Sequence, residues 1–198
     1  WNSDSAHEGV LGHGTQLNYD MRVQEFTDEG ATVVLLEDGR SAVFDALPYT
    51  GNSDYNRHEK LTLTRTDLDE YRLFDRQDRL YYDFRKLHPL DAQYRLYAIR
   101  NEAAFLVSSH YNSKGHLVQL IDSVGRRLHI ENDPQGRITA LAARQLFFEA
   151  GNEAIETDHQ VRVLGGAAFE GLAVQLAQEV DRQVVALGGP DGLALLVF

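Results

Sequence analysis

The chain contains 198 residues, of which 30 are acidic and 19 are basic, so its formal net charge at pH 7 is −11. This length suits one domain with a substantial core and is too short for two comfortable domains. Because an acidic surface repels a phosphate backbone, the composition argues against nucleic acid as a partner. Cysteine is absent, which excludes disulfides and thiolate metal sites and leaves the redox compartment undecided.

The sequence carries no targeting or membrane signal. No stretch approaches about 18 consecutive apolar residues, and no basic segment followed by an apolar run opens the chain. We therefore expect no membrane segment and no signal peptide in this chain. The chain begins at Trp1 without an initiator methionine, from which we expect a processed product or an excised part of a longer polypeptide.

Apolar residues between positions 19 and 148 recur mostly at every second position, which is typical of strands with one buried face. Residues 61–65 alternate cleanly, and Leu80, Tyr82 and Phe84 share one face. Polar and glycine-containing turns separate the strands at residues 28–30, 37–39, 50–54, 67–70, 112–115 and 133–136. The sequence therefore predicts a mainly β protein whose antiparallel hairpins follow one another as a meander.

Two segments depart from this pattern. Residues 47–60 are polar and turn-rich without periodicity, which predicts a long surface loop. Beyond Gly165, apolar residues spaced by three or four predict a short helix near residues 168–186. Alternation within residues 172–176 and the glycine-rich residues 188–192 fit strands and a hairpin instead, so both alternatives stay open.

A short phrase recurs along the chain. Residues 111–120 (YNSKGHLVQL) are answered 21 positions later by residues 132–141 (NDPQGRITAL), and residues 122–128 and 36–40 are related to them. Each phrase has a polar turn, a glycine, a basic or polar residue and an alternating apolar run. Because glycine adopts the left-handed backbone conformation and Asn and Asp support turns, each copy predicts a hairpin turn that leads into a strand.

Histidines and carboxylates are the residues that would carry metal binding or catalysis. The histidines show neither a His-Glu-x-x-His motif nor a pair spaced i, i+4. The carboxylates of residues 67–78 occupy turn positions, where Asp makes local hydrogen bonds. A Ser-His-Asp set drawn from residues 108–110 and Asp122 lacks the Gly-x-Ser-x-Gly elbow. We therefore predict no catalytic residue, no metal, no cofactor and no enzyme; a hydrolase with an Asp/Glu pair is the least supported alternative.

Aromatic residues suit either cross-strand packing or a platform on which sugar rings stack. Packing is the favoured interpretation, and Tyr82, Tyr94 and Tyr97 are the candidates for contact with a partner or with the contents of a cavity. The full set is Tyr71, Tyr81, Tyr82, Phe84, Tyr94, Tyr97 and Tyr111.

The order of these phrases resembles the RHS/YD-repeat family. Residues 1–4, 9–14 and 18–23 are similar to the opening of the RHS core, and residues 122–128 and 132–141 are similar to the recurring Asp-x-x-Gly-Arg-Leu phrase of the family. Weaker similarity continues through residues 38–44, 55–57 and 61–63. The sequence departs from the family at Thr15, at Tyr111-Asn112, at Glu131-Asn132 and beyond about residue 150.

The resemblance implies an RHS/YD-repeat-like β-sheet over residues 1–150 and a divergent segment, 151–198, that packs on the sheet or extends it. In such proteins the repeats wind into a β-shell. The chain would thus be a structural, N-terminal part of an RHS core that encapsulates a C-terminal toxin in a bacterial secreted effector used in interbacterial competition. The implied partners are the remaining RHS repeats and the toxin domain of the same protein, together with the proteins of a type VI or related secretion apparatus. The implied location is the cytoplasm of the producer before secretion. The alternative is a stand-alone β-sheet module that binds a glycan or a protein.

The residues expected to shape the repeat turns have a structural role in this interpretation. They are Gly12, Gly14, Gly39, Arg40, Gly115, Gly125, Arg126, Gly136 and Arg137.

Overall fold

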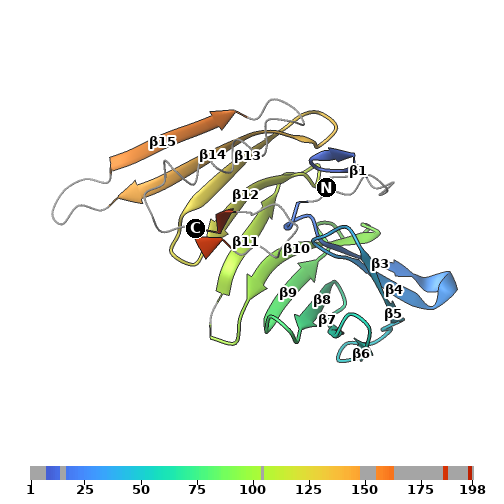
Figure 1. Cartoon of the computed structure of the whole chain (residues 1–198). Coiled ribbons are helices and arrows are strands. Elements are labelled where there is room, and N and C mark those ends of the chain that lie inside the picture. Colours follow the sequence, from blue (N-terminus) through green and yellow to red (C-terminus); the bar gives the residue numbers. More distant parts are fainter. Residues whose placement is uncertain are drawn as a thin grey trace.

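A computed structural model describes residues 8–13, 17–103, 105–147, 155–162, 185–186 and 196–197. These residues confirm a mainly β, antiparallel fold in which thirteen strands form one sheet (Figure 1). The first strands are β1 (Glu8–Gly9), β2 (Gly12–His13), β3 (Arg22–Phe26), β4 (Ala31–Leu35), β5 (Ser41–Asp45), β6 (Ser53–Asn56) and β7 (Leu61–Asp67). The strands that follow are β8 (Glu70–Asp75), β9 (Leu80–Arg85), β10 (Gln93–Arg100), β11 (Phe105–Tyr111), β12 (Leu117–Asp122), β13 (Arg127–Asn132), β14 (Ile138–Phe147) and β15 (Ile155–Arg162). A single turn of 3-10 helix, Thr27–Glu29, joins β3 to β4.

The sheet is a meander over most of its width. Strands β6 to β15 lie side by side in chain order, each antiparallel to the next (Figure 1). Strands β3, β4 and β5 form a second short meander, which joins the sheet through pairing of β3 with β10. Consecutive strands are therefore neighbours almost everywhere, as short hairpin connections require.

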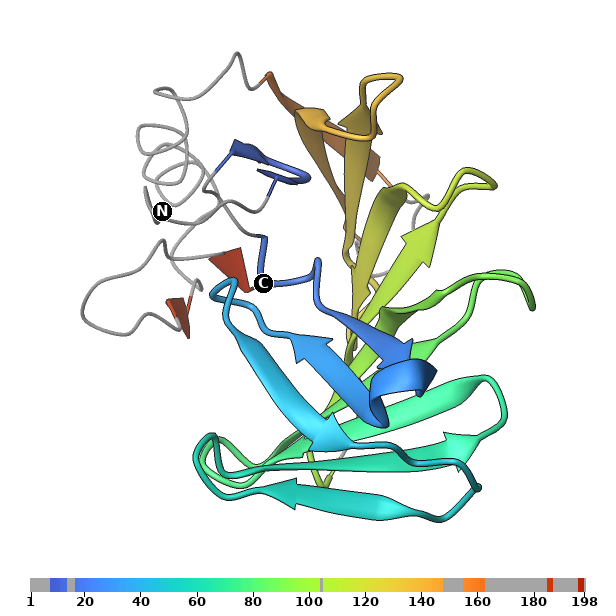
Figure 2. The same cartoon turned by 90° about the vertical axis from the view of Figure 1, so that its right-hand side faces the viewer.

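Strand β10 is the branch point of the sheet. Its residues 93–95 pair with β3, whereas its residues 98–100 pair with β11. Strand β9 occupies the other edge of β10 from Arg95 to Arg100, so β3 and β11 share a single edge. Figure 2 shows the resulting separation of β3–β5, in blue, from β11–β14, in green to yellow.

The core follows the alternation expected of strands with one buried face. Burial alternates along β4, β5 and β10, where every second side chain is buried. The rings of Tyr71 and Tyr94 meet edge to face with centroids 4.8 Å apart. The largest fully buried side chains are Met21, Val23, Thr32, Val34, Phe44, Leu63, Tyr71, Leu73, Phe84, Tyr94 and Leu96.

Two predictions from the irregular segments change. Residues 47–60 are not entirely a loop, because Ser53–Asn56 form β6, which pairs with β7. The prediction was wrong because this edge strand is polar and lacks apolar alternation. Near the C-terminus, β16 (Val185–Ala186) pairs with β17 (Leu196–Val197), as the hairpin alternative predicts. Of the alternative helix near residues 168–186, residues 168–184 lie outside the described residues, and residues 185–186 belong to β16.

Candidate functional site

One hairpin turn occurs three times in succession, in the connections from β11 through to β14. In the β12–β13 turn, the Asp122 N–H donates to the Arg126 carbonyl at 3.1 Å, and the Gly125 N–H donates to the Asp122 carbonyl at 3.1 Å. Gly125 has a φ of 86°, in the left-handed region that favours glycine. The same two backbone bonds close the turns at residues 112–116 and 133–137. The repeated phrase of the sequence is thus one repeated backbone structure.

The side chain of the first turn residue completes this structure. Oδ1 of Asp122 accepts hydrogen bonds from the Val124 and Arg126 N–H groups at 3.0 and 2.9 Å, and Oδ2 accepts one from Nε of Arg126 at 2.6 Å. The turn at 133–137 repeats these three bonds at 3.0, 2.9 and 2.7 Å. In the turn at 112–116, the Asn112 amide oxygen makes only the two backbone bonds, at 3.0 Å each. A single carboxylate therefore binds two turn amides and the guanidinium that follows the glycine.

These contacts change the acidity of Asp133. Burial acts to raise the pKa of the Asp133 carboxyl, but hydrogen bonds from Arg137 and Gln135 outweigh it and lower the pKa below its usual value. The turn thus binds the ionised form of the carboxyl.

The turn at residues 36–40 keeps the backbone bonds and moves the aspartate. The Leu36 N–H donates to the Arg40 carbonyl at 2.8 Å, and the Gly39 N–H donates to the Leu36 carbonyl at 3.0 Å. Asp38, two positions after Leu36, accepts from the Arg40 N–H at 3.0 Å and pairs with the Arg40 guanidinium. The guanidinium of Arg40 also reaches Glu59, in the β6–β7 turn, at 2.7 Å.

Two further turns of related construction follow Asn56 and Asp75, which the sequence places in a loop and at a turn position but not in the recurring phrase. The Asn56 amide oxygen accepts from the backbone N–H groups of residues 58 and 59, at 3.0 Å each. Asp75 binds the amides of residues 77 and 78 in the same way, at 2.7 and 3.3 Å. The left-handed residue is Lys60 in the first turn and Arg79 in the second, with φ of 58° and 57°. Neither turn contains the glycine of the recurring phrase, so their relation to it was not predicted; Asn or Asp followed four positions later by Lys or Arg was the available signal.

Successive turns at one end of the sheet pack on each other. A Cβ atom added to Gly136 would lie 2.8 Å from Cδ2 of His116, in the preceding turn of that end. The Asn132 side-chain amide donates to the Leu117 carbonyl at 2.8 Å. One turn earlier, a Cβ on Gly115 would lie 3.6 Å from Leu87. The 21-residue period therefore corresponds to two strands, after which the next turn fits against the last.

Two of the predicted structural glycines lie near the N-terminus. Gly12 belongs to β2, which pairs with β1. Val10 lies in the turn between β1 and β2, and its carbonyl accepts a hydrogen bond from the N–H of Ile138, the first residue of β14, at 2.8 Å. This bond joins the N-terminal hairpin to the main sheet. Gly14 lies outside the described residues.

The three tyrosines proposed as contact residues lie in different surroundings. Tyr94 has 0% of its surface exposed, and Tyr82 is half-buried against the core. Burial, and after it the charge of Glu37, raises the pKa of the Tyr82 hydroxyl above its usual value. Tyr97 is half-buried, with the Arg85 guanidinium 4.8 Å from the centre of its ring. The ring of Tyr94 is therefore not accessible to an external sugar, and contact of these tyrosines with a partner or cargo stays a prediction.

A buried aspartate joins three strands by charge. Asp83 on β9 is 2% exposed, and its carboxylate lies 2.6 Å from Nε of Arg72 on β8 and 2.7 Å from Nε of Arg100 on β10. The Arg72 guanidinium also lies 5.7 Å from the centre of the Tyr81 ring. Because a buried carboxylate is costly unless paired, Asp83 serves as a cross-strand clamp.

A second polar cluster lies at the edge of the core. Oε1 of Glu25 accepts from the Tyr71 hydroxyl at 2.6 Å and from Nη1 of Arg65 at 2.7 Å. The guanidinium of Arg65 also donates to the carbonyls of Leu47 and Leu68 at 3.0 and 2.7 Å. Burial, followed by the hydrogen bond to Glu25, raises the pKa of the Tyr71 hydroxyl. These contacts join β3, β7 and β8 to one another and to the connecting segments at Leu47 and Leu68.

The residues of the Ser-His-Asp set do not assemble. Oγ of Ser108 and Nε2 of His110 lie 3.1 Å apart, but both oxygens of Asp122 bind groups of its own turn. Among the described residues, no group of three or more His, Asp or Glu side chains is arranged to hold a metal ion. Within the same ranges, no helix has the length and apolarity to span a membrane.

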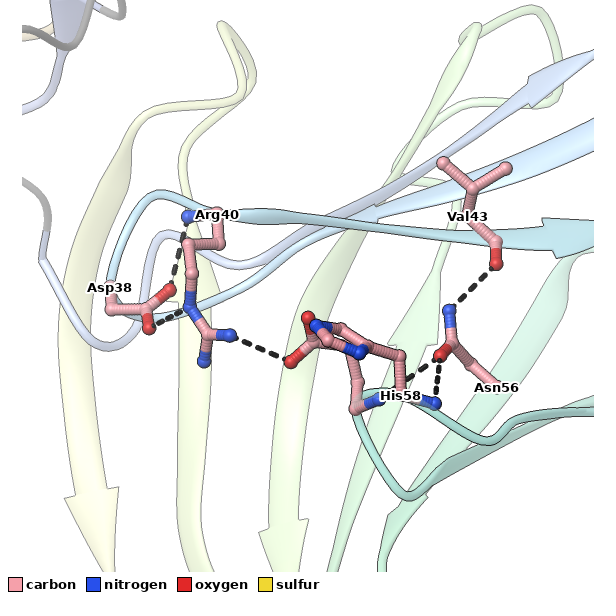
Figure 3. Close-up of polar contacts among 6 residues, drawn as sticks. Asp38, Arg40, Val43, Asn56 and His58 are labelled. Atoms are coloured by element: carbon pink, nitrogen blue, oxygen red, sulfur yellow. Dashed lines mark hydrogen bonds and ion pairs between the residues drawn. The ribbon is translucent and has the colours of Figure 1, made fainter.

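Strands β5 and β6 meet along a seam that side chains close. Within the described part of the chain, β5 forms a backbone ladder only with β4, and β6 only with β7. Between them, the Asp45 N–H donates to Oδ2 of Asp54 at 2.9 Å, and Nδ2 of Asn56 donates to the Val43 carbonyl at 3.0 Å. Figure 3 shows Asn56 directed at Val43, and Arg40 between Asp38 and the β6–β7 turn. Strands β3 to β10 thus form a ring in which backbone pairing joins every neighbouring pair except β5 and β6, and side chains join those two.

This architecture defines a class of protein: an antiparallel β-meander built from hairpins with Asx-stabilised turns. Residues 1–44 match the family model described as Domain of unknown function (DUF6531). The matched segment ends within β5 and includes the turn at residues 36–40. No curated protein matches the sequence.

Proposed function

We propose that this chain is part of the wall of an RHS-type β-cage, which encapsulates a C-terminal toxin domain in a bacterial secreted effector. The observation that carries the proposal is the packing of one repeat turn on the next, with His116 against Gly136 and Asn132 bonded to Leu117. A unit that fits against its own predecessor can be added again without a new kind of contact.

The geometry gives each repeat a definite length of wall. Neighbouring strands lie about 4.8 Å apart, so the two strands of one repeat add about 10 Å to the width of the sheet. The phrases that resemble the RHS/YD family, at residues 122–128 and 132–141, coincide with the turns of β12–β13 and β13–β14. A longer series of such phrases would extend the same sheet in the same direction.

The proposed mechanism is steric. A continuous sheet of paired strands has few unpaired backbone groups and separates the enclosed domain from the outside. In this proposal the partners of the chain are further repeats and the toxin domain of the same protein, and the secretion apparatus carries the assembly from the producer cytoplasm.

The test begins with the complete reading frame that encodes this segment. We expect further Asp-x-x-Gly-Arg phrases about every 20 residues, followed by a C-terminal domain of different composition. Limited proteolysis of the purified full-length protein should leave that C-terminal domain intact under conditions that digest the same domain expressed alone. A reading frame without further repeats, or equal digestion of the two forms, would refute the proposal.

A further inference from the structure

The outer edges of β5 and β6 face each other without a backbone ladder. An edge strand presents N–H and C=O groups that pair readily with another chain. On β5 the Val43 carbonyl and the Asp45 N–H are such groups, and each is bound by a side chain of β6, Asn56 and Asp54 respectively. Since Asp54 and Asn56 are two positions apart, their side chains leave the strand on the same side.

Both side chains are held in place by their own strand and turn. Oδ1 of Asn56 accepts from the backbone N–H groups of His58 and Glu59, which directs its NH₂ group at β5. Oδ1 of Asp54 accepts from the Tyr55 N–H at 2.8 Å, which leaves Oδ2 for the Asp45 N–H. The side chains are therefore oriented before they meet β5, so little rotamer entropy is lost on closing the seam.

An ion pair closes one end of the seam. Nη1 of Arg40, in the β4–β5 turn, lies 2.7 Å from Oε2 of Glu59, in the β6–β7 turn (Figure 3). The Arg40 side chain is 60% exposed and that of Glu59 is 17% exposed, so solvent screens this contact and its contribution is small. The two hydrogen bonds to the backbone of β5 are the essential part of the seam.

We propose that the seam is a built-in block against strand addition, which prevents β5 from pairing with a second copy of this chain. A second copy is the expected occupant of an opened edge, because antiparallel pairing of β5 with itself is symmetric and closes a dimer. Val43 is 57% exposed on β5 and would gain an apolar cross-strand contact in that dimer. With the proposed function, the block places this chain at a closed end of the wall, from which the sheet grows only beyond β15.

The test compares three forms of the full 198-residue chain: wild type, the double variant Asp54→Ala/Asn56→Ala, and the control Ser53→Ala. Ser53 lies in the same strand, but its hydroxyl contacts Thr64 of β7 at 2.8 Å and not β5. In hydrogen exchange, we expect the Asp45 amide to lose at least about tenfold protection in the double variant, because an unpaired edge amide opens more readily. Sedimentation velocity should show a concentration-dependent dimer that wild type and the control do not form.

Two further variants keep the proposal falsifiable if the double variant folds poorly. Asn56→Asp retains the turn acceptor but lacks the NH₂ donor to Val43, so we expect it to form the dimer with an unchanged far-UV spectrum. It keeps the bond from the Asp45 N–H to Asp54, so the protection of that amide should fall less than in the double variant. Asp45→Pro added to the double variant removes the edge donor and should abolish the dimer. Unchanged protection of the Asp45 amide in the double variant, or an unchanged mass in both the double variant and Asn56→Asp, would overturn the proposal. These measurements use the chain alone, so a negative result would refute the block against strand addition and leave the cage proposal standing. A reading frame without further repeats would refute the cage proposal and leave the block standing.

Discussion

Replacement of Gly136 by alanine tests whether the repeat turns pack on one another. Gly136 and Gly125 have the same φ, 86°, and occupy the same position in successive turns. A Cβ on Gly125 would meet nothing within 4 Å, whereas a Cβ on Gly136 would lie 2.8 Å from Cδ2 and 2.9 Å from Nε2 of His116. The two alanine variants therefore share the cost of backbone strain and differ in the steric clash.

The expected magnitudes follow from these two costs. A left-handed conformation costs an L-residue roughly 1–2 kcal/mol, and this applies to both variants. Overpacking against a neighbouring side chain adds about 1–3 kcal/mol, and this applies only to Gly136→Ala. We therefore expect Gly136→Ala to lower the free energy of unfolding by about 1–3 kcal/mol more than Gly125→Ala does.

A double-mutant cycle assigns the difference to His116. In a His116→Ala background the clash is absent, so the cost of Gly136→Ala should fall to that of Gly125→Ala. The assay is equilibrium urea unfolding followed by far-UV circular dichroism, with all four turn variants at one protein concentration. Equal losses for the two glycine variants, or no rescue by His116→Ala, would refute the packing of turn on turn.

The other predictions concern single turns and titrating groups. Asp122→Ala should destabilise the chain by about 1–2 kcal/mol, because two turn amides lose their acceptor, and urea unfolding measures this; a loss below about 0.3 kcal/mol would contradict the role of the side chain. Lys60→Gly should stabilise it by about 0.5–1 kcal/mol, since its φ of 58° is strained for lysine; thermal unfolding measures this, and a lower midpoint would refute it. Hydrogen bonds lower the pKa of Asp133 below 3.8, its usual value, so its contribution to stability is present at neutral pH. This contribution is lost as the pH falls below 3.8 and through the lower pKa of the folded state. NMR titration of the carboxyl checks this, and a midpoint at or above 3.8 would contradict it. Burial, followed by the charge of Asp122, raises the pKa of Tyr19 from 10.0 to about 12. The contribution of Tyr19 to stability should therefore be constant below pH 10 and fall as the pH rises toward 12, which unfolding followed by circular dichroism at each pH measures. Tyr19→Phe should remove this part of the pH dependence.

Local chemistry determined the elements that were predicted correctly from the sequence. The turns at residues 112–116, 122–126 and 133–137 are closed by hydrogen bonds within five residues, so their structure depends on little beyond their own sequence. The alternation of residues 61–65 likewise predicted a strand with one buried face, which β7 forms. The relation of the turns at Lys60 and Arg79 to the recurring phrase was not predicted, because the left-handed residue in each is not glycine.

Contacts between distant residues were decided only by the tertiary structure. Pairing of β3 with β10 joins residues about 70 positions apart, and no local pattern indicates which strand receives β3. The polar segment at residues 53–56 becomes a strand only because β7 lies beside it, and its Asp54 and Asn56 become the seam only because β5 faces them. The recurring phrase in the sequence thus determined a series of hairpins, whereas the coiling of the sheet placed His116 on Gly136 and brought the edges of β5 and β6 together. The physical reason is that hairpin turns depend on near neighbours in the chain, while the fit between turns and between edges depends on how the whole sheet twists.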